Sequence, residues 1–323
     1  MKKAIVILVN GEVLSDKFSS TIDSQRDKAH ELAQCLLPIF RSNLQVAILH
    51  GNKPQVGFVL YRSELASHLL HSVPLDVCGA DTQGATGYML VQALHNVLVE
   101  NQLQRPVISI VTQTVVDAED PLFHQPTKAI GPYFDRDKAE QHRQNRGWHM
   151  LLEPGRGYQR AVSAPRPLEI VEMEGIKQLV ESGTVVIAAG GGGIPVVRTN
   201  NGCFQGVEAV VDTDRVSCLM AGQLQAPVLL MIVDRDEKFA LMGLSSEQRT
   251  ELLLPDLETL LSGETFTSQM VRGKLQAAAD FLHGGGKQVI ITTLRRLPTM
   301  LNGKAGLHIG RVRLAPDQYP WSA

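Results

Sequence analysis

The chain has 323 residues, of which 44% are hydrophobic and 20% are charged, and its formal net charge is −2. This composition predicts a globular protein with an ample core, built as one large domain or two modest ones. No basic stripe marks a surface for nucleic acid or for an anionic membrane, so we expect partners of neither kind. No apolar run approaches the length of a transmembrane helix, and no cleavage site follows the short apolar run near the start, so we expect a cytoplasmic protein.

Short apolar runs alternate with helical patterns along the chain. Residues 5–9 predict a first strand, and residues 24–40 predict a helix with one apolar stripe, in which Pro38 is expected to kink or end the helix. The alternation predicts an α/β fold with a mainly parallel sheet, in which ligands bind beyond the carboxyl ends of the strands. Further strands are expected at residues 44–49, 107–111, 185–189, 228–233 and 289–292, and further helices at residues 170–180 and 274–282.

One long region breaks this alternation. Residues 117–166 are rich in proline, glycine, histidine and charge, and they show no apolar period. A plain connection in a compact domain is much shorter than this region. We therefore interpret it as an excursion or lid with a functional role.

The cysteines and histidines do not predict a metal site. The four cysteines are widely spaced, without a C-x-x-C pair, and we expect small buried side chains in a reducing compartment. His68 and His71 form an H-x-x-H pattern without a carboxylate partner, which we interpret as an ordinary helix surface. The four cysteines are Cys35, Cys78, Cys203 and Cys218.

Two glycine-containing loops follow predicted strands directly. One covers residues 50–57, and the other contains four consecutive glycines at residues 190–193. Backbone amides at a turn from strand to helix can hold a phosphate or a carboxylate. For one such loop alone, a tight turn whose glycines allow close packing is an equally good interpretation. Two such loops at one edge of a sheet favour an anion site.

The sequence lacks the motifs of several well-known binding and catalytic sites. Pro195 breaks the dinucleotide-binding fingerprint after the four glycines, and residues 284–288 lack the serine or threonine of a P-loop. No G-x-S-x-G elbow for a hydrolase is present. Anion loops and lysines remain, and they suit phosphoryl transfer, which needs positioning and positive charge. Lys128 and Lys274 are the candidate lysines, with a surface lysine as the alternative for either one alone.

Five segments match a known family in order and separation. They read HGNKPQVG, VTQTVVDAEDPLFHQPTKAIGPYF, GRGYQRAVSAPRP, VVIAAGGGGIPVV and GVEAVVDTD. Through them, the chain from about residue 2 to residue 309 resembles the carbamate kinases of the amino acid kinase family. The resemblance implies a three-layer α/β/α sandwich with a central mostly parallel sheet. It also implies one domain over residues 1–310, with 117–166 as a protruding lid subdomain, a tail at 311–323, and a homodimer.

The resemblance further implies a reaction and roles for single residues. Carbamate kinases transfer a phosphoryl group from carbamoyl phosphate to ADP, giving carbamate and ATP, or in the reverse direction. Mg²⁺ accompanies the nucleotide. Lys128 then reaches from the lid to the transferring phosphoryl group, Lys274 contacts the nucleotide phosphates and Asp214 orients the lysines. The implied contacts to substrate or phosphate are Asn10, Gly11, Gly51, Asn52, Lys53, Gln55, Gly190, Gly191, Gly192 and Gly193, and those to the nucleotide are Asp234, Asp236 and Lys274.

The chain departs from the family pattern in the loops that carry the chemistry. The family's first strand ends in Gly-Gly-Asn, where this chain has Val9, Asn10 and Gly11, and we expect the Val9 side chain to fill space that glycine leaves for a phosphate oxygen. The family's Asp-Lys-Asp motif has Thr213 in place of its lysine. Loss of such a cation costs about 3–4 kcal/mol of transition-state stabilisation, roughly 10²–10³ in rate.

These departures leave two hypotheses open. The first is a carbamate-kinase-like phosphotransferase acting on carbamate or a related small carboxylate with reduced activity, in which Lys53 replaces the lost cation. The second is a catalytically degenerate paralogue that binds a carbamoyl or phosphoryl anion or a nucleotide as a sensor, or serves as a partner subunit. The adenine-side motif also departs from the family, at residues 233–236 and 242–245.

Overall fold

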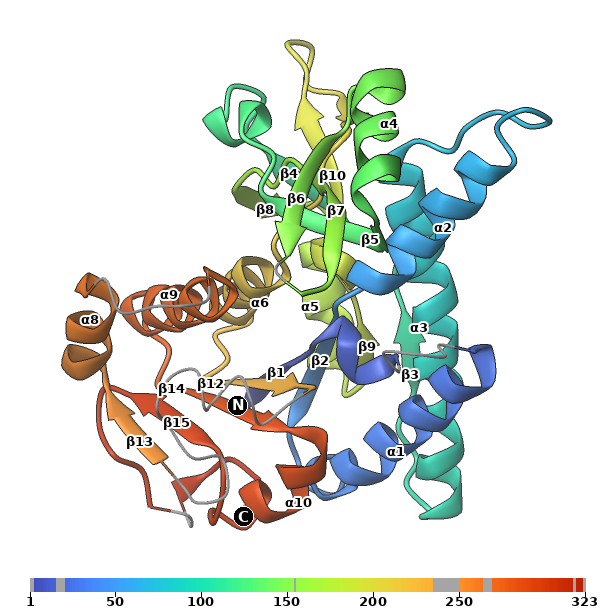
Figure 1. Ribbon diagram of the computed structural model, residues 1–323. Coiled ribbons are helices and arrows are strands. Elements are labelled where there is room, and N and C mark those ends of the chain that lie inside the picture. Colours follow the sequence, from blue (N-terminus) through green and yellow to red (C-terminus); the bar gives the residue numbers. More distant parts are fainter. Residues whose placement is uncertain are drawn as a thin grey trace.

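An eight-stranded sheet forms the centre of the molecule (Figure 1). The computed structural model describes residues 3–15, 21–153, 155–234, 250–263, 269–315 and 318–321. The strands lie in the order β13-β15-β14-β12-β1-β2-β9-β3, and each neighbouring pair is parallel except β14 with β15. The expected α/β class with a mostly parallel sheet is confirmed. The bounds are β1 Ala4–Val9, β2 Gln45–His50, β3 Val107–Ser109, β9 Val185–Ile187, β12 Val228–Val233, β13 Thr250–Leu253, β14 Gln288–Thr293 and β15 Leu307–Gly310.

Helices cover both faces of this sheet, because its central strands are apolar on both sides. In β1, Val6 and Leu8 point into one core, whereas Ile5, Ile7 and Val9 point into the other. The result is the expected α/β/α sandwich. The first core is covered by α5 (Met173–Glu181), α6 (Thr213–Gln223), α8 (Leu254–Ser262) and α9 (Gln269–His283), and the second by α1 (Ile22–Arg41), α3 (Leu75–Glu100) and α10 (Leu297–Leu301).

Pro38 does not end α1, which continues to Arg41. Leu36, Ile39 and Phe40 are buried on either side of the proline, so packing holds the last turn in place. Pro38 itself is exposed, so water can satisfy the carbonyl that loses its helical partner.

Other boundaries also differ from expectation. The predicted helix at 170–180 begins only at Met173, because Ile170 ends a strand, and the strand predicted at 185–189 ends at Ile187. The histidines of the H-x-x-H pattern are exposed in the segment after α2 (Lys53–Leu65), so their assignment to a helix surface is wrong. Cys203 is exposed, contrary to the expectation of buried cysteines. Among the described residues, no helix combines the length and the apolar character that a membrane span requires.

Residues 117–166, called the lid below, form structure that the sequence pattern did not reveal. Strands β5 (Lys128–Phe134), β6 (His149–Glu153) and β7 (Gly157–Val162) form an antiparallel sheet in the order β5-β7-β6, next to α4 (Arg136–Arg146). Phe134, Ala139 and Met150 make a separate small core, too small to produce a visible apolar period. The boundaries of the lid as a subdomain stay a prediction.

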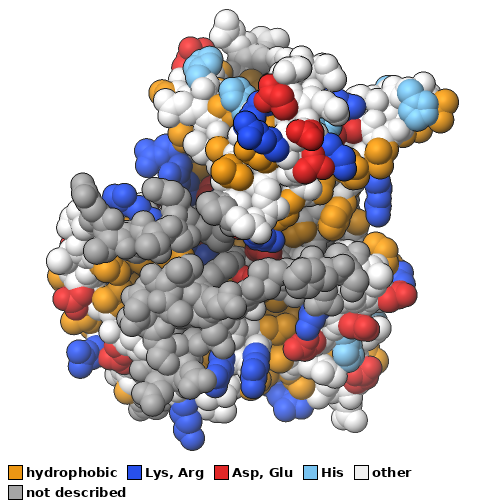
Figure 2. Space-filling view, in the orientation of Figure 1, with side chains coloured by type: hydrophobic (Ala, Val, Ile, Leu, Met, Phe, Trp, Pro, Cys, Tyr) orange, Lys and Arg blue, Asp and Glu red, His pale blue; other side chains and the backbone are white. Residues whose placement is uncertain are grey.

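The lid lies above the carboxyl ends of the central strands (Figure 1). In the same orientation, Figure 2 shows acidic and basic side chains interspersed over this upper part. A further sheet in the order β11-β10-β4-β8 lies beside the lid. Its strands are β4 (Gln113–Val116), β8 (Pro167–Ile170), β10 (Ile194–Arg198) and β11 (Phe204–Gly206).

Two contacts attach the lid to α2. Glu64 Oε1 in α2 lies 3.5 Å from Arg146 Nη1 and 3.7 Å from Arg160 Nη1, and both arginines belong to the lid. Gly57 and Gly131 bring the two backbones together so closely that a Cβ on Gly57 would lie 2.1 Å from the Gly131 Cα. These contacts pack the lid against α2, and β5, which begins at Lys128, is the lid strand that lies along this helix.

The end of the chain packs into the second core. His308 Nε2 lies 2.9 Å from the carbonyl oxygen of Ala305, so Nε2 carries the hydrogen and Nδ1 accepts from the Tyr319 hydroxyl at 2.6 Å. Trp321 stacks on Tyr319 with ring centroids 5.0 Å apart, and its Nε1 donates to the Leu301 carbonyl. The described part of the tail therefore covers the core beneath α10.

We predict that Trp321→Ala lowers the free energy of unfolding by about 3 kcal/mol, because it removes a buried aromatic side chain. Urea denaturation measures this loss. Val312→Ala is the control, since Val312 lies in the same tail but is 62% exposed, and it is expected to change the free energy by less than about 0.5 kcal/mol. Equal losses in the two variants would contradict the packing of the tail.

Candidate active site

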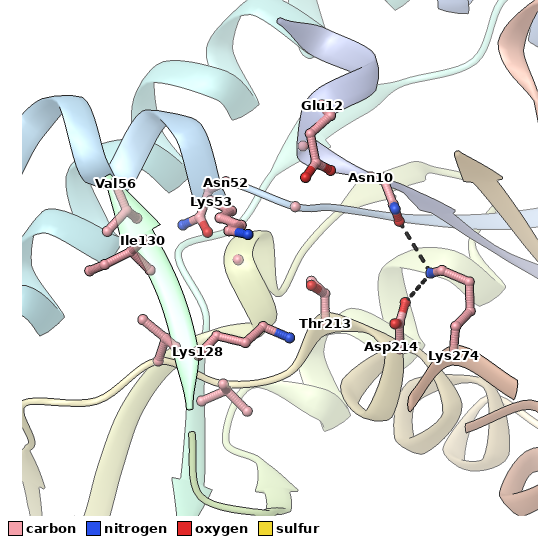
Figure 3. Close-up of a pocket in the computed structure, with 15 residues that line it drawn as sticks. Asn10, Glu12, Asn52, Lys53, Val56, Lys128, Ile130, Thr213, Asp214 and Lys274 are labelled. Atoms are coloured by element: carbon pink, nitrogen blue, oxygen red, sulfur yellow. Dashed lines mark hydrogen bonds and ion pairs between the residues drawn. The ribbon is translucent and has the colours of Figure 1, made fainter. Parts of the chain in front are cut away.

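A pocket opens where the loops after β1 and β2 meet the lid and the start of α6 (Figure 3). Its volume is about 90 Å³. This is the position at which ligands bind in a sheet of this kind, beyond the carboxyl ends of the strands. The lining residues are Asn10, Gly11, Glu12, Gly51, Asn52, Lys53, Val56, Lys128, Ile130, Gly191, Val210, Val211, Thr213, Asp214 and Lys274.

Two lysines from distant parts of the chain meet in this pocket. Lys128 comes from β5 in the lid, and its Nζ lies 2.6 Å from Asp212 Oδ2. Lys274 comes from α9, and its Nζ pairs with the carboxylate of Asp214 and lies 3.4 Å from Asn10 Oδ1. The structure thus brings together Lys128, Lys274 and Asp214, the three residues with expected catalytic roles.

Asp212 does two things, and sequence reasoning did not assign it to the site. Its Oδ2 holds Lys128, while its Oδ1 accepts the backbone N–H of Asp214 at 3.0 Å and caps α6. The sequence analysis predicted no helix at residues 213–223, so the cap at Asp212 was not foreseen, and only the fold shows that Lys128 reaches the other oxygen. One residue therefore fixes both the helix start and a lysine.

Both members of this ion pair keep their charge. Burial, the largest single effect, raises the pKa of Asp212, but the charge and hydrogen bond of Lys128, together with the charges of Lys274 and Arg215, hold that pKa below its ordinary value. Burial, the largest single effect, lowers the pKa of Lys128, but the carboxylate of Asp212, together with the charges of Asp214 and Glu12, raises it above its ordinary value. The pocket therefore presents a charged ammonium group at neutral pH.

The four consecutive glycines prove to be mainly a close-packed turn. A Cβ on Gly191 would lie 2.1 Å from Asn52 Nδ2, and one on Gly192 would lie 2.5 Å from the Val211 carbonyl oxygen. Both glycines have positive φ, +69° and +92°, which L side chains rarely adopt. Of residues 190–193, only Gly191 lines the pocket. Close packing requires glycine at these positions, and the role of residues 190–193 in binding a phosphate stays a prediction.

The expectation for Val9 is wrong. Val9 is fully buried in the second core and does not line the pocket. Strand alternation explains this, because Val9 shares its face of β1 with Ile5 and Ile7. The next residue, Asn10, turns its side chain into the pocket and bonds Lys274.

The loops at Gly11 and Gly51 pack against each other at the pocket wall. A Cβ on Gly51 would lie only 2.5 Å from the backbone nitrogen of Gly11. Asn52 donates from Nδ2 to Thr82 Oγ1 at 2.6 Å, which fixes that side chain. Lys53 enters the pocket with Lys128 from the side opposite Lys274 (Figure 3).

His50, just before this loop, is fully enclosed. Burial lowers its pKa to about 4, although the nearby Gly51 carbonyl opposes the shift, so the ring is neutral at physiological pH. A Cβ on Gly190 would lie 2.5 Å from His50 Nε2, which makes His50 part of the packing of the glycine turn.

Two further expected site residues among the described ones, Gln55 and Asp234, do not line the pocket. Gln55 is buried, and within the described residues neither atom of its amide has a hydrogen-bond partner, but it does not line the pocket. Asp234 lies just after β12 and does not line the pocket either. Asp236 and the rest of the expected adenine-side motif fall outside the described residues. Their roles stay predictions.

The fold and this pocket define a class of protein. The family model described as "Amino acid kinase family" matches residues 11–293, and the chain belongs to that family. It is 38% identical to carbamate kinase-like protein YahI of Escherichia coli, over 96% of this chain and 99% of that protein. It is 36% identical to the carbamate kinase of Pyrococcus horikoshii, with the same two coverages.

A solved structure gives the same picture. Carbamate kinase from Giardia lamblia bound to AMP-PNP matches with a TM-score of 0.84 and 33% identity, over 96% of this chain and 98% of that chain. The resemblance to carbamate kinases, inferred first from five sequence segments, is confirmed, and so is the amino acid kinase fold.

We predict that Asp212→Ala and Asp212→Asn differ in stability but not in their effect on Lys128. Asparagine still caps α6, so Asp212→Ala is expected to lower the free energy of unfolding by about 1 kcal/mol more than Asp212→Asn. Both variants remove the carboxylate and are expected to lower the pKa of Lys128. Urea denaturation and NMR titration of ¹³C-methylated lysines measure the two effects. Equal stability and an unchanged Lys128 titration would contradict the dual role.

Proposed function

We propose that this chain is a phosphotransferase of the carbamate kinase type. It would move a phosphoryl group between carbamoyl phosphate, or the phosphate of a related small carboxylate, and ADP, giving ATP. The observation that carries the proposal is the meeting of Lys128 and Lys274 in one pocket, each held by a carboxylate at the start of α6. Full-length similarity to carbamate kinases supports the same reaction class.

The arrangement suits phosphoryl transfer because this reaction depends mainly on positioning and on positive charge. Lys128 and Lys274 approach from opposite sides, so a phosphoryl group between them gains charge stabilisation from both. Their aspartate partners hold them in place, which lowers the cost of organising the site in the transition state.

A nucleotide is proposed as the second substrate, since a related carbamate kinase binds AMP-PNP. Mg²⁺ would enter with the nucleotide phosphates, as it commonly does in kinases. The described residues contain no group of three or more His, Cys, Asp or Glu side chains arranged for a metal. No step of the proposed reaction is therefore assigned to a protein-held metal.

We further infer that the phosphotransferase has reduced activity. Thr213 lies in the pocket wall where the family motif has a lysine, so the middle of the turn carries no cation. Lys53 enters the same pocket from the loop after β2 and is the proposed replacement. The missing charge at Thr213 also favours the second candidate, an anion-binding sensor or partner subunit without turnover. A homodimer and a cytoplasmic location stay predictions.

We predict that Lys128→Ala lowers the rate of ATP formation from ADP and carbamoyl phosphate by about 10²- to 10³-fold, because it removes a cation at the transferring group. A luciferase-coupled assay measures ATP. Lys138→Ala is the control, since Lys138 is also a lid lysine but pairs with Asp135 on an exposed surface. It is expected to keep the parent rate.

Two outcomes would contradict the proposed activity. They are a parent rate no higher than background at high enzyme concentration, and equal rates for Lys128→Ala and Lys138→Ala. Thr213→Lys then separates the two candidates. A slow but working enzyme gains rate over a measurable parent rate, whereas a degenerate paralogue shows activity only after the substitution.

A further inference from the structure

One acidic side chain of the pocket, that of Glu12, has no partner in the part of the chain that the structure describes. Glu12 lies in the short helix η1 (Gly11–Leu14), which follows β1 directly, and Figure 3 shows its carboxylate pointing into the pocket. Within the described residues, the carboxylate of Glu12 makes no hydrogen bond or ion pair. The other acidic residue of the lining, Asp214, pairs with Lys274.

The cations of the pocket do not neutralise Glu12 by direct contact. Lys128 and Lys274 are each held by their own aspartate. Lys53 has an interaction of its own. Its positive charge also helps to lower the pKa of Glu153 in the lid. Glu12 and Lys128 both line the pocket, and the charge of Glu12 helps to raise the pKa of Lys128.

An unpaired carboxylate at this position selects among ligands. A phosphorylated ligand with a second, purely anionic group would bring that negative charge close to the carboxylate of Glu12, and the repulsion would weaken binding. Such a ligand would also remove water from the carboxylate without replacing its hydrogen bonds, which costs free energy. A ligand with an N–H group instead donates to the carboxylate, and such charge-assisted hydrogen bonds are among the stronger ones. The phosphoryl end of the same ligand faces the lysines.

We propose that Glu12 is a specificity-determining residue that accepts a hydrogen bond from an N–H group of the small substrate. The pocket then selects amide- or amino-bearing phosphorylated compounds over compounds of the same shape that lack the N–H. The inference rests on the proposed function only in taking this pocket as the place where the phosphoryl group binds.

Two stable ligands of matched shape test the inference without turnover. Phosphonoacetamide carries an NH₂ group where 2-oxopropylphosphonate carries a methyl group. Isothermal titration calorimetry without nucleotide, with EDTA present, gives the affinity of each ligand for the parent, Glu12→Ala, Glu12→Gln and the surface control Glu100→Gln. Glu12→Gln keeps the shape of the side chain and guards against a loss of folding in the alanine variant.

The parent and Glu100→Gln are expected to bind phosphonoacetamide about 10- to 100-fold more tightly than 2-oxopropylphosphonate. Glu12→Ala is expected to reduce this ratio to within about threefold. Glu12→Gln is expected to keep an intermediate ratio, since its amide oxygen still accepts but carries no charge.

Several results would overturn the inference. They are a ratio near one in the parent, an unchanged ratio in Glu12→Ala, and no binding of either ligand. Equal strengthening of both ligands in the Glu12 variants would also overturn it, because Glu12 would then only repel anions. A large ratio in the parent, together with no ATP formation in the kinase assay, would support the inference and refute the proposed function.

Discussion

Two ion pairs at the start of α6 hold the candidate site together. Asp212 holds Lys128 from the lid, and Asp214 holds Lys274 from α9, so a three-residue turn joins parts of the chain that are far apart in sequence. Thr213, between the two aspartates, faces the pocket without a charge. The position of the lid therefore matters for chemistry, and its contacts with Glu64 of α2 help to set where Lys128 lies.

The sequence predicted the central sheet well, because parallel strands that are buried on both faces consist of continuous apolar residues. It predicted the lid poorly, since a small core such as that around Phe134 produces no periodic signal. Lys128 and Lys274 were candidate lysines from their motifs, but each alone had a surface lysine as the alternative. The resemblance implied that both act at the phosphates, and the fold shows that they meet at one pocket.

Residue-level expectations failed where they depended on the direction of a side chain. Val9 follows the alternation of β1 into the core and does not line the pocket. Glu12, three residues further along, was not singled out, although its carboxylate enters the pocket. Neighbouring residues at the end of a strand can thus face a core and a ligand site, and only the backbone path distinguishes them.

The central claim is that Lys128 and Lys274 act on one phosphoryl group. A crystal structure of the protein with phosphonoacetamide tests it most directly. The account predicts phosphonate oxygens within about 3.2 Å of both Nζ atoms, with the aspartate partners still in place. A phosphonate bound outside this pocket, or touching only one of the two lysines, would contradict it.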